Sequence, residues 1–161
     1  MSRNFECTDP GCDDGTMSTP DAAAAPSLIL RQVVFDCPDA RSLAEFYRVL
    51  FGLAYRPGDE SPTGGDADPR GSDWLVLVGD GGWRLAFQQV PDLPEPTWPT
   101  GPRPQMLHLD STVSSTADLH RQRERALALG ARELLDRSDD ADEPLFVFAD
   151  PAGHPFCIFV A

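Results

Sequence analysis

The chain has 161 residues and a formal net charge of −13, and 41% of its residues are hydrophobic. This length fits one domain with a hydrophobic core. The negative charge argues against a nucleic-acid or anionic-membrane partner, because phosphate binding needs a basic face. No apolar run approaches the length of a membrane span and no signal-peptide pattern opens the chain, so we expect a cytoplasmic protein.

The four cysteines do not form a disulfide pattern. Cys37 and Cys157 lie in apolar runs, where cysteine usually behaves as a small buried hydrophobe. Cys7 and Cys12 lie in a polar segment with no second pair nearby, and a structural zinc site would need four ligands.

Residues 1–26 are polar, rich in small residues and without periodic apolar content, so we predict a disordered extension and a folded domain over 27–161. The domain pattern then occurs twice. The first copy, about 28–90, predicts a strand over 28–37, a helix over 40–51 capped by Asp39 and ended by Gly52, and a short strand over 53–56. Strands over 74–78 and 83–90 flank the hairpin signal of residues 79–82.

The second copy, about 104–161, repeats this order. It predicts a strand over 105–113, a helix over 116–129 capped by Ser114 or Ser115, and strands over 132–135, 145–149 and 155–160. A proline-rich crossover joins the copies. The sequence therefore predicts an α+β fold of two β-α-β-β-β modules, each with one bare sheet face, and the two bare faces can form a shared concave cleft.

Three motifs resemble the glyoxalase/bleomycin-resistance/dioxygenase (vicinal oxygen chelate) superfamily. They are residues 33–39 (VVFDCPD), residues 43–52 with LAEFY and LFG, and residues 150–154 (DPAGH). The resemblance covers nearly all of 30–160 and implies a glyoxalase-like domain protein.

The resemblance also implies four positions where metal-using members hold ligands. Here these positions are Gln32, Ala86, His108 and Cys157. The two last-strand positions, which hold carboxylates in metal-dependent members, carry a methyl group and a thiol. We therefore expect no tightly bound metal and no cofactor at these four residues.

Strand alternation predicts which side chains line the cleft. We expect an apolar, aromatic-walled site with a few polar groups, as small-molecule sites usually have. Trp98 in the crossover is either a wall of the cleft mouth or a packing residue. The candidate ligand-binding residues are Gln32, Leu75, Leu77, Arg84, Ala86, Gln88, Trp98, His108, Asp110, Phe146, Phe148, Cys157 and Phe159.

Two functions stay open. The first is metal-free binding of a small, largely apolar molecule, as in the bleomycin-resistance branch that the sequence resembles, with Gln32 and His108 as orienting contacts. The second is a glyoxalase-type lyase, isomerase or epimerase acting next to a carbonyl, in which His108 would serve as a base if a second group orients it. A homodimer is also expected, because open sheets have edges to cover.

Overall fold

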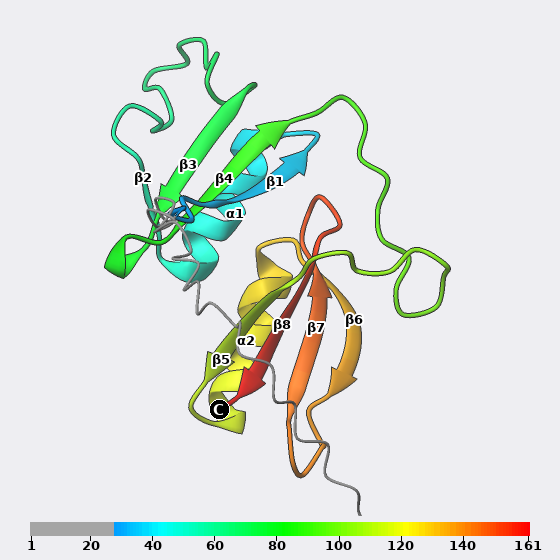
Figure 1. The fold of residues 1–161 in the computed structure, drawn as a ribbon. Coiled ribbons are helices and arrows are strands. Elements are labelled where there is room, and N and C mark those ends of the chain that lie inside the picture. Colours follow the sequence, from blue (N-terminus) through cyan, green and yellow to red (C-terminus); the bar gives the residue numbers. More distant parts are fainter. Residues whose placement is uncertain (1–27) are drawn as a thin grey trace, which may run out of the picture. The chain divides into compact units, whose positions relative to one another are not determined.

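The computed structural model describes residues 28–161, of which Arg31–Ala161 form one compact unit. The prediction of a disordered extension over 1–26 lies outside the described residues. Two modules follow each other along the chain, each with one helix against a four-stranded sheet (Figure 1). The predicted α+β fold of two β-α-β-β-β modules is confirmed. Neither described helix is long and apolar enough to cross a membrane.

The first module has strand order β1-β4-β3-β2, with β1 parallel to β4 and the other pairs antiparallel. Its elements are β1 Val33–Cys37, α1 Ala40–Phe51, β2 Ala54–Tyr55, β3 Trp74–Val78 and β4 Arg84–Gln89. A short 3₁₀ turn, Asp80–Gly82, joins β3 to β4 at the predicted hairpin.

Helix α1 has the bounds that the sequence predicts because both of its ends are specified locally. The Asp39 carboxylate accepts a hydrogen bond from the backbone N–H of Ser42 at 2.9 Å, which satisfies one of the free donors of the first turn. Gly52 adopts the left-handed conformation (φ 69°), which glycine takes without steric cost and which ends the helix.

The second module repeats the topology with strand order β5-β8-β7-β6. Its elements are β5 Leu109–Val113, α2 Thr116–Ala128, β6 Arg132–Arg137, β7 Leu145–Ala149 and β8 Pro155–Val160. Ser115 caps α2 by accepting from the backbone N–H of Asp118 at 3.1 Å. The β7–β8 turn contains Gly153 at φ 98°.

The first strand of each module starts later than the apolar pattern predicts. Strand β1 starts at Val33, which pairs with Leu85, and β4 extends only one residue, Arg84, before this pair. Strand β5 starts at Leu109, because Met106 has a left-handed backbone (φ 63°) that interrupts an extended chain. Gln32 and His108 therefore lie just outside the strands.

A buried hydrogen-bond network joins the modules. The Tyr47 hydroxyl on α1 donates to Asp150 Oδ2 in the β7–β8 turn at 2.8 Å, and both side chains are fully buried. Asp150 also accepts from the backbone N–H groups of Ala152 and His154 and lies 2.9 Å from His154 Nδ1.

Aromatic contacts between the modules surround this network. The Phe35 ring meets the His154 ring edge-on, and Phe46 of α1 packs on Phe156 of β8. These contacts come from the helix side of each module.

Candidate functional site

The two faces of the first sheet differ in what covers them. In the β3–β4 pairing, Leu75 lies opposite Phe87 and Leu77 lies opposite Leu85. These four side chains belong to the buried cluster under α1. Val76 lies opposite Ala86 in the same pairing. Because paired residues share a face, both lie on the face of the sheet away from α1. We call the face away from the helix the open face. The prediction that Leu75 and Leu77 lie beside Ala86 is therefore wrong: both are core residues.

The second sheet shows the same separation. In the β7–β8 pairing, Phe146 lies opposite Ile158 and Phe148 lies opposite Phe156. All four belong to the buried cluster on the α2 side. The Arg123 guanidinium of α2 lies 5.3 Å from the centre of the Phe146 ring. The prediction that Phe146 and Phe148 share a face with Cys157 is also wrong. They are core residues, because the hairpin pairs Cys157 with Val147, one residue away from either phenylalanine, and a shift of one residue inverts the face.

The open face of the second sheet combines apolar and polar side chains. Cys157 pairs with Val147 on one side and with Asp110 on the other, and Phe159 follows two residues along the same face. Val147 is buried, whereas Cys157 and Phe159 are half-buried. Val147 is missing from the candidate residues predicted from the sequence. The length of the β7–β8 turn sets the hairpin register and could have identified it.

Three of the predicted polar residues come together on this face. His108, Asp110 and Cys157 each place one donor atom within 4.8 Å of the other two, and His108 Nε2 lies 3.4 Å from Asp110 Oδ1. Burial raises the pKa of the Cys157 thiol to about 11, and the adjacent Asp110 carboxylate adds to the shift. A free Cys157 is consequently a neutral thiol near pH 7 and a poor nucleophile.

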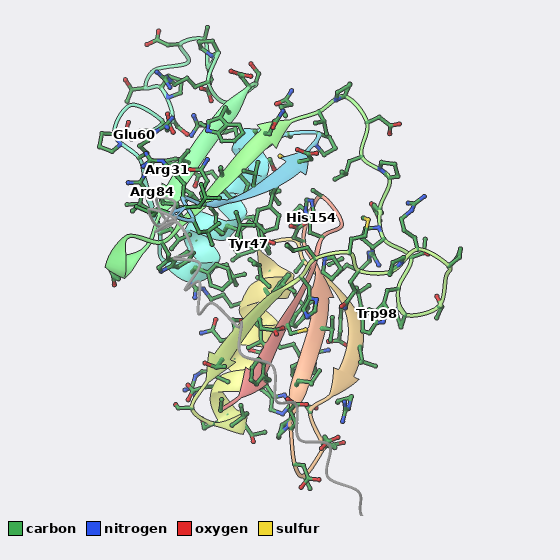
Figure 2. The ribbon with its side chains drawn as sticks, in the orientation of Figure 1. Arg31, Tyr47, Glu60, Arg84, Trp98 and His154 are labelled. Carbon is green, nitrogen blue, oxygen red and sulfur yellow. The ribbon has the colours of Figure 1, made fainter. Side chains whose placement is uncertain are left out.

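The first sheet presents its predicted polar residues at two places on the open face. Arg84 and Gln88 flank Ala86 on β4, with Arg84 half-buried and Gln88 exposed. Gln32 precedes β1, next to the start of β4, since Val33 pairs with Leu85. Figure 2 shows Arg31 and Arg84 at the same end of this module, where β1 and β4 begin.

Trp98 lies in a different environment. It lines a surface pocket of about 440 Å³ together with the crossover residues around it and with residues of β6, β7 and the start of β8 (Figure 2). Among the lining residues of this pocket, Trp98 is the one member of the predicted ligand-binding set. The structure thus gives Trp98 a position beside the second module and does not bring it to the His108 cluster.

Two β-α-β-β-β modules, each with one helix against a four-stranded sheet, define a protein of the vicinal oxygen chelate class. The sequence matches the family described as "Glyoxalase-like domain" over residues 32–159, which is most of the chain. The protein therefore belongs to the glyoxalase-like domain family. No curated protein sequence matches the chain.

Solved structures give the same fold at low sequence identity. The fosfomycin resistance protein FosX from Mesorhizobium loti is 18% identical, with a TM-score of 0.57 over 82% of this chain and 91% of that one. A glyoxalase/bleomycin resistance protein/dioxygenase family enzyme from Burkholderia phytofirmans is 15% identical, with a TM-score of 0.57 over 81% and 96%. FosX from Listeria monocytogenes, complexed with Mn(II) and sulfate, is 16% identical, with a TM-score of 0.56 over 82% and 91%.

Proposed function

We propose that the protein binds a small, largely apolar molecule against the open faces of its sheets, with the His108 cluster as the polar anchor. The observation that carries the proposal is the convergence of His108, Asp110 and Cys157 on a face that also carries the apolar side chains of Val147 and Phe159. A few convergent polar groups on an apolar surface are the usual composition of a small-molecule site.

The first module supports the proposal with a second apolar surface. Val34, Val76 and Ala86 lie on the same face, since Val34 pairs with Ala86 and Ala86 with Val76. Val76 and Ala86 are already buried in the single chain, whereas Val34 is 42% exposed, so Val34 is the one of the three that a ligand could cover. Gln32 and Arg84 supply hydrogen-bond donors at the edge of this surface. Apolar area removed from water on binding would contribute about 25 cal/mol per Å², and the polar groups would set orientation.

A homodimer belongs to the same proposal. Strands β1 and β5 are edge strands of their sheets, and their free edges can pair with another chain. Large apolar side chains near these edges are solvent-exposed in the single chain: Val34 by 42%, Met106 by 73% and Leu107 by 53%. A second copy that covers these residues would also enclose the open faces.

A second candidate function is catalysis next to a carbonyl, as a lyase, isomerase or epimerase. The observation that favours it is the 3.4 Å approach of His108 Nε2 to Asp110 Oδ1, because a carboxylate beside an imidazole can orient it as a general base. In this function His108 would take a proton from a carbon adjacent to the carbonyl, and the amide of Gln32 would orient the carbonyl oxygen.

A ligand screen by thermal shift tests the binding proposal with small aromatic and carbonyl compounds as probes. Compounds that stabilise the wild type should lose their effect in Phe159→Ser and bind severalfold more weakly to His108→Ala. Trp98→Ala is the matched control, since Trp98 lines a separate pocket and its loss should leave binding unchanged. The binding proposal is wrong if no compound stabilises the wild type, or if Trp98→Ala alone removes the effect. Proton exchange into a carbonyl probe, lost in His108→Ala, would favour the catalytic candidate.

A further inference from the structure

A further pocket lies on the helix side of the second module, across the sheet from the His108 cluster. It has a volume of about 220 Å³ and is bounded by the end of α1, by β5 and by α2. Ser111 of β5 pairs with Ile158 of β8, and Ile158 belongs to the buried cluster on the α2 side. Because paired residues share a face, the Ser111 and Ile158 side chains in this pocket point away from the open face. We call it the Arg125 pocket, after the residue of α2 that also lines it.

The walls of the Arg125 pocket are apolar and held in place by the core. Leu50 and Phe51 come from the last turn of α1. Leu50 and Ile158 are only 6% and 4% exposed, and the Phe51 ring stacks on the Tyr47 ring with centres 5.8 Å apart. Walls that are fixed by core packing do not have to be ordered when a ligand arrives, which reduces the cost of binding.

Arg125 supplies the positive charge of the pocket and is exposed to solvent. Its guanidinium donates to the backbone carbonyl of Val49 on α1 and, at 3.4 Å, to the side-chain oxygen of Gln122. Both acceptors are neutral, and within residues 28–161 Arg125 forms no ion pair with a carboxylate. Since a guanidinium has five N–H donors, Arg125 keeps donors for a ligand.

This uncompensated charge distinguishes the Arg125 pocket from two other pockets that contain an arginine. Arg132 lines the pocket beside the crossover and pairs with Glu95. Arg137 lines a surface pocket in the loop after β6 and pairs with Asp140. An anionic ligand at either place would compete with a carboxylate of the protein, whereas at Arg125 it would compete only with neutral acceptors.

We propose that the Arg125 pocket binds a small carboxylate with a compact apolar body. A carboxylate accepts two parallel hydrogen bonds from a planar guanidinium, and the apolar body would lie against Leu50, Phe51 and Val113. The volume of 220 Å³ is that of roughly seven water molecules at about 30 Å³ each, so the ligand is smaller than drug-sized molecules. At physiological salt, charges more than about 8 Å away are largely screened, so Arg125 outweighs the net negative charge of the chain. The proposal does not rest on the open-face site, because it uses the other side of the sheet.

Cyclohexanecarboxylate is a suitable probe, because it joins a carboxylate to a compact saturated ring, and cyclohexanecarboxamide is its neutral isostere. Calorimetric titration of the full chain at about 0.15 M salt should give one site for the carboxylate, with a Kd of about 1 mM or tighter. The carboxamide should bind at least about tenfold more weakly, because it lacks the charge-assisted pair of hydrogen bonds. Amide chemical shifts in labelled protein should change at Val113 and Gln122 and not at His108.

Matched variants assign the anchor. Arg125→Gln should weaken carboxylate binding at least about tenfold, and Arg125→Lys should lose less, because lysine keeps the charge without the planar fork. Arg121→Gln is the control and should leave binding unchanged, since Arg121 lies on the same helix but pairs with Asp118 outside the pocket. Gln122→Phe adds a ring to the pocket wall and should also weaken binding while Arg125 is kept.

Three results would overturn the proposal: no saturable binding of the carboxylate up to about 10 mM, equal affinity for the carboxamide, or equal losses in Arg121→Gln and Arg125→Gln. The comparison of carboxylate with carboxamide uses the wild type, so it decides the question even where a variant fails to fold. His108→Ala and Phe159→Ser should leave carboxylate binding unchanged. Loss of binding in these two variants would place the carboxylate on the open face and overturn the assignment to the Arg125 pocket.

Discussion

Replacing Tyr47 by phenylalanine removes one hydroxyl from the buried network between the modules and should lower the stability of the whole domain. The hydroxyl donates to Asp150 Oδ2 at 2.8 Å, and the Asp150 side chain is fully buried. Phenylalanine keeps the ring that stacks against Phe87, so the packing of α1 on the sheet is preserved. The perturbation is therefore the loss of a single hydrogen bond to a buried carboxylate.

The size of the effect follows from the partners that Asp150 keeps. A hydrogen bond to a charged group contributes about 1.5–3 kcal/mol. Two backbone N–H groups and the His154 ring remain on Asp150, so the lower value applies. We expect Tyr47→Phe to lower the free energy of unfolding by about 1.5 kcal/mol, which is roughly a 5 °C lower Tm for a domain of this size.

Urea unfolding followed by circular dichroism measures this change, and Tyr55→Phe is the matched control. The Tyr55 hydroxyl also donates to a carboxylate at 2.8 Å, but its partner Glu45 is on the surface, with a side chain 37% exposed. The control should therefore lose less than about 0.5–1 kcal/mol. A double-mutant cycle with Asp150→Asn should give a coupling energy of at least 0.5 kcal/mol. Equal losses in the two tyrosine variants, or additive effects in the cycle, would refute the reasoning.

The remaining predictions concern the first module, alkaline pH and assembly. Asp59→Ala should lower the free energy of unfolding, measured with urea, by about 2 kcal/mol. The fully buried carboxylate accepts from the backbone N–H of Val76, which would be left without this partner. A loss of less than about 0.5 kcal/mol would contradict this prediction. Burial raises the pKa of Tyr47 well above 10 and that of Tyr55 to about 12. The two hydroxyls therefore contribute fully to stability below pH 10, and this contribution falls above pH 10. An absorbance titration should show phenolate forming only as the protein unfolds. Phenolate in the folded protein at pH 10 would contradict this prediction. Light scattering at high micromolar concentration should give a dimer, and a monomer would contradict the proposed assembly.

The element order could be predicted because each signal is local. Asp39 and Gly52 fix the ends of α1 through contacts within four residues, and the glycine turns fix the hairpins. The late start of β5 could not be predicted, because the left-handed backbone at Met106 is not encoded by a glycine or asparagine. The pattern of apolar residues continues through Met106 and Leu107, although the strand does not.

The faces of the sheets were harder to predict than the strands. Alternation identifies the buried face only where the other face is polar. Strand β7 reads LFVFA and β3 reads WLVLV, so both of their faces are apolar and either parity is acceptable from the sequence. The face is then decided by hairpin register, which depends on the turns and was assigned one residue away from its true value. An apolar open face is itself informative. Val76 and Val147 are buried there, but Val34 remains 42% exposed beside them, and an exposed apolar side chain at this place is what a ligand or a second copy could cover.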